Sequence, residues 1–376
     1  MESNNIKYTA DKILKFAKRY NNSKRSYLLV NPLQAKHMAV SPSEALNMMQ
    51  TLGTKLFEKY PDNRLVIGFA ETATAVGAVV ASCFDENCNY IHTTRENLQS
   101  DNFIEFLEEH SHATEQKLST INLNEFLDNT NSVTFIDDEI STGKTLINII
   151  NQLRNQLDAF KNKEIICASI INRVSDENMK KLSDNDIKCE YLLKIENEDC
   201  EKKVKDIHIT SAEDLMNVCV EHDFCEYSLP SLKDARTGVN IKDYKNKCLE
   251  ISKTIAEKIG NKISGDILVL GTEEFMYQSI ILGKVLEDSG KYNSICCHST
   301  TRSPIGICNE NKYPIYEGYK IPSFYDENRE TYIYNLKHYD SAIITTDSNN
   351  YNIKSVSAII KVLKYHKCEK IFIFRE

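Results

Sequence analysis

The chain lacks a basic face and a long apolar run, and each absence excludes a class of protein. Its 46 Lys and Arg stand against 54 Asp and Glu, for a net charge of −8. This balance argues against a binder of nucleic acid or of anionic membranes, because both need positive charge. The most apolar segment, Thr72 to Phe84, is shorter than the ~18 residues of a membrane span. The N-terminus has no continuous apolar region, so we expect no signal peptide.

The chain also lacks a cysteine framework. Its 12 cysteines are scattered, and pairs such as Cys83 and Cys88 or Cys219 and Cys225 are too far apart for a C-x-x-C motif. We therefore expect free thiols in a cytoplasmic protein rather than disulfides or a zinc site. The content of 41% apolar and 27% charged residues is typical of a folded globular chain, and 376 residues suggest two or three domains.

Short apolar runs alternate with amphipathic helices in the first half of the chain. Leu65 to Ala70 is too short for a helix and is predicted as a buried parallel strand. Further strands are predicted at 133–136 and 165–171, and helices at 74–83, 145–157 and, behind the N-cap Thr210 or Ser211, at 211–221. This order predicts a parallel sheet with helices on both faces.

The second half repeats this rhythm after an irregular segment. Residues 226–240 contain Pro230 and Gly238 and show no periodicity, so we predict domains at residues 1–225 and 241–376 with 226–240 as the linker. The second domain begins with an amphipathic helix, Ile241 to Ile259. Strands are predicted at 267–270, 294–297, 342–345 and 370–374. The predicted fold class is α/β, with two domains that are each a mainly parallel sheet flanked by helices.

Three short stretches of the first half recur in the second half in the same order. Leu65 to Thr72 is similar to Leu268 to Phe275, and Thr93-Thr-Arg matches Thr300-Thr-Arg. Phe135-Ile-Asp-Asp aligns with Ile344-Thr-Thr-Asp. The matches indicate either a duplicated α/β unit or a chance similarity between generic strand–helix units.

The most informative motif is the stretch from Val133 to Thr145, VTFIDDEISTGKT. Its apolar residues predict a strand that carries Asp137 and Asp138 to the carboxyl edge of the sheet, where open α/β sheets bind ligands. The hydroxyl-rich turn that follows opens a helix, and its N–H groups suit a phosphate. It is no Walker A loop, because that motif needs a glycine at the position of Asp138.

This acidic pair with its Thr-Gly-Lys-Thr turn resembles the ribose 5-phosphate signature of type I phosphoribosyltransferases. The resemblance implies the topology of that family for the first domain. It also implies that Asp137 and Asp138 bind the ribose hydroxyls of phosphoribosyl pyrophosphate. The implied phosphate loop comprises Glu139, Ser141, Thr142, Gly143, Lys144 and Thr145. Magnesium is the implied cofactor, bridging the diphosphate and the ribose hydroxyls, and no direct protein ligand to the metal is predicted.

Two further segments acquire a role from this resemblance. The turn after the first strand becomes the pyrophosphate loop, with Glu71, Thr72, Ala73 and Thr74, although a plain strand–helix turn is the alternative. Arg95 becomes a catalytic candidate that contacts the pyrophosphate, together with Asp137 and Asp138. His110 and His112 become loop residues near the substrate. Ordinary surface positions are the alternative for these three side chains, and a zinc site at the histidines lacks a third ligand.

The N-terminal segment, at about 24–42, resembles the hood of orotate-phosphoribosyltransferase-like domains found with bacterial tellurite-resistance gene clusters. Lys36 and His37 are the candidates on the side of the base. The tetrapeptide Thr301-Arg-Ser-Pro304 matches the one that names the TRSP domain, which follows those domains. The resemblance therefore covers nearly the whole chain.

The TRSP domain brings no established chemistry. Its turn at Asp347 lacks the second acid and the Thr-Gly-Lys-Thr loop, so a duplicate would have lost the ribose phosphate site. Side chains predicted to gather at one edge of its sheet are Glu273, Glu274, Thr301, Arg302, Ser303 and Asp347. They would bind a different ligand or close over the first site, or else cap helices and pair as ions.

Two functions remain open from the sequence. The first is an enzyme that transfers ribose 5-phosphate between phosphoribosyl pyrophosphate and a nitrogen base, either orotate-like or unusual. The second is a sensor that binds phosphoribosyl pyrophosphate or a nucleotide without turning it over. Both predict small-molecule partners, and a homodimer is compatible with either.

Overall fold

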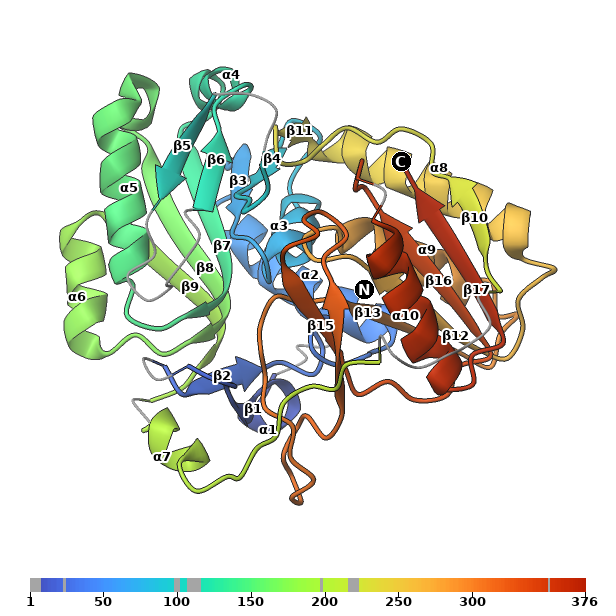
Figure 1. Ribbon diagram of the computed structural model, residues 1–376. Coiled ribbons are helices and arrows are strands. Elements are labelled where there is room, and N and C mark those ends of the chain that lie inside the picture. The colour runs from blue at the N-terminus through green and yellow to red at the C-terminus, as the bar shows by residue number, and fades with distance from the viewer. Residues whose placement is uncertain are drawn as a thin grey trace. The chain divides into compact units, whose positions relative to one another are not determined.

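The computed structural model describes residues 8–22, 25–97, 102–106, 116–196, 199–215, 223–350 and 352–376 (Figure 1). Within these ranges no helix is long and apolar enough to cross a membrane. Contacts divide the chain into two compact units. Unit 1 comprises Met1–Ala10, Asn47–Glu198 and Leu232–Asn246, and unit 2 comprises Asp11–Leu46, Asp199–Ser231 and Lys247–Glu376.

Unit 1 is built on a six-stranded sheet in the order β11-β4-β3-β7-β8-β9. Its strands are β3 (Leu65–Gly68), β4 (Asn89–His92), β7 (Ser132–Ile140), β8 (Glu164–Asn172), β9 (Ile187–Lys194) and β11 (Val239–Asn240). All neighbours are parallel except β11, which is antiparallel to β4. The buried parallel sheet predicted for the first half is confirmed.

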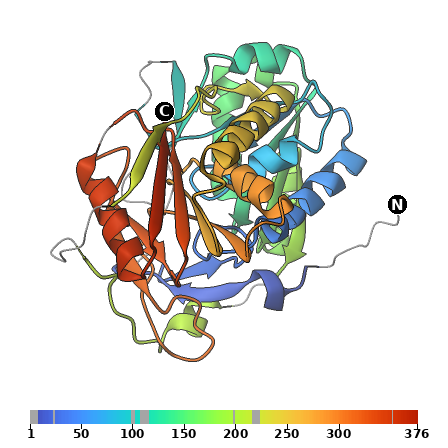
Figure 2. The ribbon, with the colours of Figure 1, turned by 90° about the vertical axis from the view of Figure 1, so that its right-hand side faces the viewer.

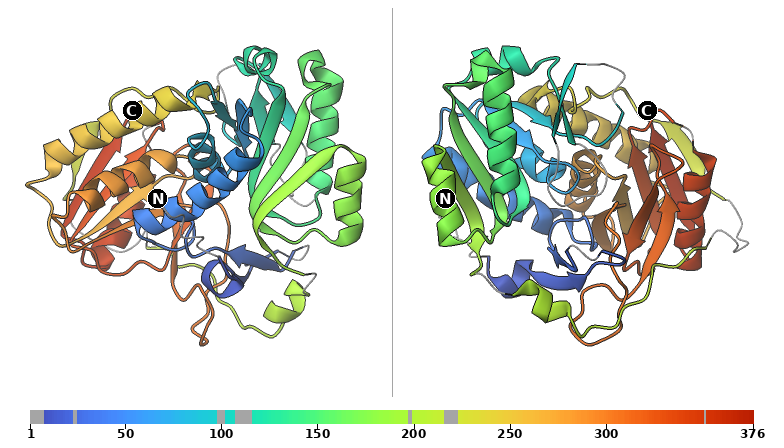
Figure 3. Two further views of the ribbon diagram at one scale, coloured as in Figure 1. Left: turned by 180° about the vertical axis from the view of Figure 1, so that it is seen from behind. Right: turned by 60° about the vertical axis from the view of Figure 1, so that its left-hand side comes forward.

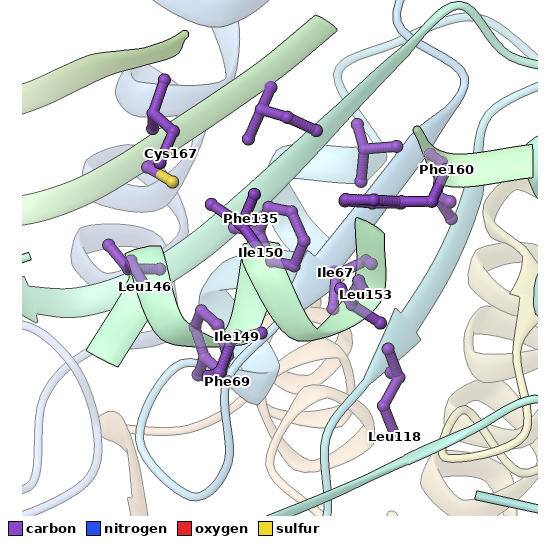
Figure 4. Packing of buried hydrophobic residues seen from close by; sticks show 14 of the residues in the cluster. Ile67, Phe69, Leu118, Phe135, Leu146, Ile149, Ile150, Leu153, Phe160 and Cys167 are labelled. Atoms are coloured by element: carbon purple, nitrogen blue, oxygen red, sulfur yellow. The ribbon is translucent and has the colours of Figure 1, made fainter. Parts of the chain in front are cut away.

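Helices cover both faces of this sheet, with α5 and α6 on one face and α3 on the other (Figure 3). The helices are α2 (Pro42–Lys59), α3 (Thr74–Ala81), α4 (Leu123–Asp128), α5 (Lys144–Gln156) and α6 (Asp176–Asp184). A 3₁₀ turn, Asp158–Phe160, and the antiparallel hairpin β5 (Phe103–Phe106) and β6 (Gln116–Ser119) complete the unit. The three- and four-residue spacing of its apolar side chains gives α5 its buried face. Figure 4 shows this face against Phe69 and Phe135, whose rings stack at 5.9 Å.

Helix α3 packs unusually close to the sheet because of two glycines. A Cβ on Gly77 would lie 3.0 Å from the Cα of Gly68 and 2.9 Å from the Tyr90 ring. All eight residues of α3 are buried. The close packing fixes the short loop between β3 and α3 at the carboxyl edge of the sheet.

Unit 2 is built on a wholly parallel sheet in the order β10-β17-β16-β12-β13 (Figure 2). Its strands are β10 (Cys225–Ser228), β12 (Asp266–Gly271), β13 (Ser294–Ser299), β16 (Ser341–Thr346) and β17 (Lys370–Arg375). The helices are α8 (Ile241–Ile259), α9 (Tyr277–Asp288) and α10 (Ile353–Tyr365), and β14 (Gly318–Pro322) forms a hairpin with β15 (Glu330–Tyr334). The four predicted strands and the mainly parallel sheet are confirmed.

The segment predicted as a hood lies in unit 2. Helix α1 (Ala10–Ile13) leads into the antiparallel pair β1 (Lys15–Lys18) and β2 (Tyr27–Val30), and α7 (Cys200–Val204) packs beside them. Ala17, Leu28 and Val30 are buried with Ile305 and Ile315. The two compact units interleave along the chain, and the assignment changes five times, at 10/11, 46/47, 198/199, 231/232 and 246/247. One of these changes falls within residues 226–240, and the linker there stays a prediction.

The helix predicted at 211–221 is wrong in its described part. Residues 211–215 are not helical, and residues 216–222 lie outside the described ranges. The Thr210 N–H donates to the Ile307 carbonyl at 2.9 Å, and the Glu213 N–H donates to the Gly318 carbonyl at 2.8 Å. These long-range backbone bonds hold the segment extended, and they outweigh the local preference for an N-cap.

Candidate functional site

The acidic motif lies at the end of β7, which runs between β3 and β8. The first five residues of β7 are buried, and Asp137, Asp138 and Glu139 are half-buried. The Asp138 N–H donates to the Asp137 carboxylate at 2.9 Å. The Glu139 carboxylate lies 3.5 Å from Nε of Arg173, which follows β8. The strand thus presents the carboxylates of Asp137 and Asp138 at the carboxyl edge of the sheet, while Glu139 pairs with Arg173 after the neighbouring strand β8.

Asp138 is the point where two predicted loops meet. Burial raises the pKa of Asp138, and the charge of Glu139 adds to this, whereas hydrogen bonds with the side chains of Asp137 and Thr72 oppose it. Thr72 belongs to the loop after β3, the predicted pyrophosphate loop. Because β3 and β7 are neighbouring parallel strands, their carboxyl ends bring the two loops together.

The turn after β7 is shaped by Gly143. This residue has φ of 74°, in the left-handed region, and α5 begins at the next residue. A Cβ on Gly143 would lie 3.1 Å from the Leu182 side chain. The Lys144 N–H donates to the Thr142 hydroxyl at 3.4 Å, and the Lys144 side chain is exposed. Ser141, Thr142 and Thr145 are half-buried at this positive end of the helix.

The loop after β3 is held by two polar residues that the sequence did not single out for this purpose. The Ala70 N–H donates to the Thr93 hydroxyl at 2.8 Å, and Nε2 of Gln116 donates to the Ala70 carbonyl at 3.0 Å. The Thr93 hydroxyl in turn donates to Oε1 of Gln116 at 2.5 Å. Glu71, Ala73 and Thr74 are buried in this loop. The loop is therefore a fixed element of unit 1.

Arg95 follows β4, the strand beside β3. Thr94 forms an antiparallel bridge with Lys117, with two backbone bonds of 2.8 Å. This bridge fixes the backbone next to Arg95, whose side chain is half-buried. His110 and His112, predicted near the substrate, lie outside the described residues.

The second group of predicted residues gathers in unit 2. The Glu273 carboxylate lies 2.8 Å from Nε of Arg302, and the Glu274 carboxylate lies 3.5 Å from the same guanidinium. The Ser303 N–H donates to the Thr301 hydroxyl at 3.2 Å. Asp347, at the end of β16, accepts a hydrogen bond of 2.5 Å from the Tyr325 hydroxyl.

Two family models match the chain in succession. The phosphoribosyl transferase model matches residues 13–197, and the model of the TRSP domain, C-terminal to that transferase domain, matches residues 233–363. Residues 13–197 thus belong to the phosphoribosyltransferase family, and a TRSP domain follows them. By its first domain the protein is a transferase.

Solved structures give a weaker comparison. The chain is similar to adenine phosphoribosyltransferase from Giardia lamblia complexed with 9-deazaadenine (14% identity, 50% of this chain and 96% of that chain, TM-score 0.37). It is also similar to Mycobacterium tuberculosis orotate phosphoribosyltransferase in complex with Fe(III) dicitrate (14% identity, 48% and 90%, TM-score 0.29). Likeness at this level carries no argument about ligands. A comparison with curated proteins found no match.

Lys36 and His37, the candidates on the side of the base, are buried in unit 2. The Lys36 ammonium donates to the Glu273 carbonyl at 2.6 Å and to the Thr300 carbonyl at 2.9 Å. Lys36 therefore ties the β2–α2 segment to the loops after β12 and β13, a structural contact that the sequence did not indicate.

Magnesium fits the donors present in unit 1. In the described part of the chain no group of three His, Cys, Asp or Glu side chains could hold a metal ion. Asp137 and Asp138 nevertheless offer carboxylate oxygens at the sheet edge. Oxygen donors suit magnesium, which commonly binds to one or two carboxylates together with substrate phosphates.

Proposed function

We propose that unit 1 transfers ribose 5-phosphate between phosphoribosyl pyrophosphate and a nitrogen base, either orotate-like or unusual. The observation that carries this proposal is the parallel pairing of β3 with β7, which brings the acidic motif at the end of β7 beside the loop after β3. A ligand that joins a ribose to a diphosphate needs two such loops side by side. The match of the phosphoribosyl transferase model to residues 13–197 supports the same conclusion.

Each loop has a separate task in this proposal. Asp137 and Asp138 accept hydrogen bonds from the ribose hydroxyls, and the N–H groups of residues 141–145 bind the 5-phosphate at the positive end of α5. The loop of Glu71, Thr72, Ala73 and Thr74, together with Arg95, holds the diphosphate. Small side chains in this loop let backbone N–H groups approach an anion.

The reaction breaks the bond between ribose C1 and the diphosphate oxygen and forms a bond between C1 and the base nitrogen. Its transition state is oxocarbenium-like, so the protein acts mainly by holding the partners in place and by stabilising charge. Asp137 and Asp138 fix the ribose, and Arg95 faces the charge that develops on the departing diphosphate. Asp137 and Asp138 are the carboxylates that would hold a magnesium ion bound with the substrate, and that ion would supply further positive charge there.

The test is an assay of pyrophosphate release from phosphoribosyl pyrophosphate with magnesium and a panel of purine and pyrimidine bases. We expect release with one class of base, and none with the double variant Asp137→Asn/Asp138→Asn. Glu177→Gln, which replaces an exposed carboxylate on α6, is the matched control and should retain full activity. Tight binding without release for every base would instead establish a sensor.

We further propose that the protein acts in the cytoplasm. The cysteines in the described ranges are free thiols, and Cys225 is exposed. Free thiols of this kind persist in a reducing compartment. Labelling of thiols in intact cells with a membrane-permeant reagent, but not with an impermeant one, would support this location.

A further inference from the structure

The sheet of unit 2 has the same order of elements as the sheet of unit 1. The strands β13-β12-β16-β17-β10 correspond in position to β4-β3-β7-β8-β9. Along the chain, a helix (α3 or α9) follows β3 or β12, and a hairpin (β5–β6 or β14–β15) follows β4 or β13. A further helix (α5 or α10) joins β7 to β8 or β16 to β17 (Figure 1). Two strands differ, because β10 precedes the others along the chain and β11 of unit 1 has no counterpart in the described sheet of unit 2.

The polar contacts at the strand ends also correspond. In unit 1 the Ala70 N–H donates to the Thr93 hydroxyl at 2.8 Å, and in unit 2 the Glu273 N–H donates to the Thr300 hydroxyl at 3.0 Å. The residue after each threonine, Thr94 or Thr301, forms an antiparallel bridge to the second strand of the hairpin, β6 or β15. Glu273 therefore occupies the position that Ala70 has in unit 1.

This correspondence places a carboxylate where unit 1 has a methyl group. The Glu273 side chain is fully buried and lies 2.8 Å from Nε of Arg302 and 2.9 Å from a terminal nitrogen of Arg329. The Ser323 hydroxyl donates to it at 2.5 Å. The donors come from the loop after β13 and from the connection between β14 and β15. Two guanidinium groups and a hydroxyl around one oxyanion form a typical anion-binding arrangement.

A second protein group occupies the position of a ligand hydroxyl. The strand pairing that aligns Gly68 with Ile136 in unit 1 aligns Gly271 with Thr345 in unit 2, so Asp347 corresponds to Asp138. Asp347 accepts a hydrogen bond of 2.5 Å from the Tyr325 hydroxyl, which also lies 2.9 Å from the Thr272 hydroxyl. The comparison with a ribose hydroxyl rests on the proposed function of Asp138.

We infer that unit 2 is a repeat of the phosphoribosyltransferase fold whose anion site, formed by Arg302, Arg329 and Ser323, is occupied by the Glu273 carboxylate of the chain itself. Tyr325 fills the adjoining hydroxyl position. Unit 2 therefore binds no diphosphate, and the intact chain holds phosphoribosyl pyrophosphate at one site only, in unit 1.

The test removes the internal anion and adds an external one. Glu273 has φ of 46°, which suits glycine, so Glu273→Gly removes the carboxylate and relaxes the backbone. Calorimetric titration of the full chain with inorganic pyrophosphate should count one more bound anion per chain in this variant than in the wild type. Adding Arg302→Ala should weaken that extra site by about tenfold or more.

Two controls make the result specific. Glu330→Ala removes an exposed carboxylate paired with Lys320 at 3.4 Å and should add no pyrophosphate. If circular dichroism shows that Glu273→Gly is unfolded, Glu273→Ala is the second variant, because it also removes the carboxylate and empties the site. Pyrophosphate should then raise the melting temperature of Glu273→Ala more than that of the wild type.

The outcomes separate this inference from the proposed function. A second pyrophosphate on the wild-type chain, or no additional one on folded Glu273→Gly, would overturn the inference. The additional anion should persist when Asp137→Asn/Asp138→Asn is introduced, because those residues belong to unit 1. A wild-type chain that binds no phosphoribosyl pyrophosphate would refute the proposed function but leave the count in Glu273→Gly meaningful.

Discussion

At the scale of single residues, the charge of Asp138 carries a cost in stability. Its raised pKa means that ionisation is less favourable in the folded chain than in the unfolded chain. The free energy of unfolding therefore falls as the pH rises from the ordinary carboxyl pKa through the raised pKa of Asp138.

We predict that Asp138→Asn raises the melting temperature at neutral pH while weakening the binding of phosphoribosyl pyrophosphate. The loss of one charged hydrogen bond should cost about 1.5–3 kcal/mol of affinity. Scanning calorimetry and titration calorimetry measure the two effects. Asp158→Asn is the control, because Lys161 lowers the pKa of that exposed carboxyl and its charge is favourable. A lower melting temperature with unchanged affinity in Asp138→Asn would contradict the proposed role.

A second prediction concerns Gly143. Gly143→Ala should lower the free energy of unfolding, because a residue with a side chain at φ of 74° costs about 1–2 kcal/mol and its Cβ would lie 3.1 Å from Leu182. Gly290→Ala is a close control, since Gly290 has φ of 62° with no atom within 4 Å of a Cβ. Urea unfolding should show a loss in both variants and a larger one at Gly143. Only Gly143→Ala should weaken ligand binding, and equal affinity in both would argue against the phosphate turn.

At the scale of elements, the sequence predicts the helices and strands whose own apolar pattern determines their conformation. Strand β3 is a continuous apolar run, and β7 has a buried, mainly apolar first half. Helix α5 has Leu146, Ile149, Ile150 and Leu153 on one buried face. Strand β10 escaped prediction because its four residues are mostly exposed and acquire a partner only from β17. The error at 211–215 has the same origin, because long-range backbone bonds decide its conformation.

In the candidate site, too, local sequence patterns could be predicted and long-range contacts could not. Asp137, Asp138 and the turn to Gly143 could be predicted because a strand, a glycine and a helix start follow one another in the chain. The contact of Gln116 with the loop after β3 could not be predicted, because nothing in the sequence around a single polar residue indicates that it will lie beside Ala70. The contacts of Lys36 with Glu273 and Thr300 likewise join segments far apart in the sequence.

At the scale of the whole molecule, each unit is assembled from separate stretches of chain. Unit 2 needs residues 11–46 and 199–231 as well as 247–376. Ile305 and Ile315 are buried against β1 and β2, and Tyr227 of β10 stacks on Phe374 at 5.2 Å. A fragment defined by the TRSP domain alone would expose these apolar side chains.

We therefore predict that residues 233–376, expressed alone, do not fold cooperatively. The loss of the N-terminal segment and of β10 uncovers one side of the core and an edge of the sheet. Co-expression with residues 1–232 should restore a soluble complex that melts like the intact chain. A sharp thermal transition of fragment 233–376 by itself, monitored by circular dichroism, would show that the interleaved segments are dispensable.

The position of β10 beside β17 also sets an order of events during synthesis. Unit 1 has all its segments once residue 246 has left the ribosome, whereas β10 gains its neighbour only when residues 370–375 emerge. Domains usually fold as they are completed, so the acidic motif of unit 1 reaches its final form while β10 still lacks its neighbour β17. The nascent chain thus carries a complete unit 1 ahead of an unfinished unit 2, and the ligand proposed for unit 1 would be able to bind before translation ends.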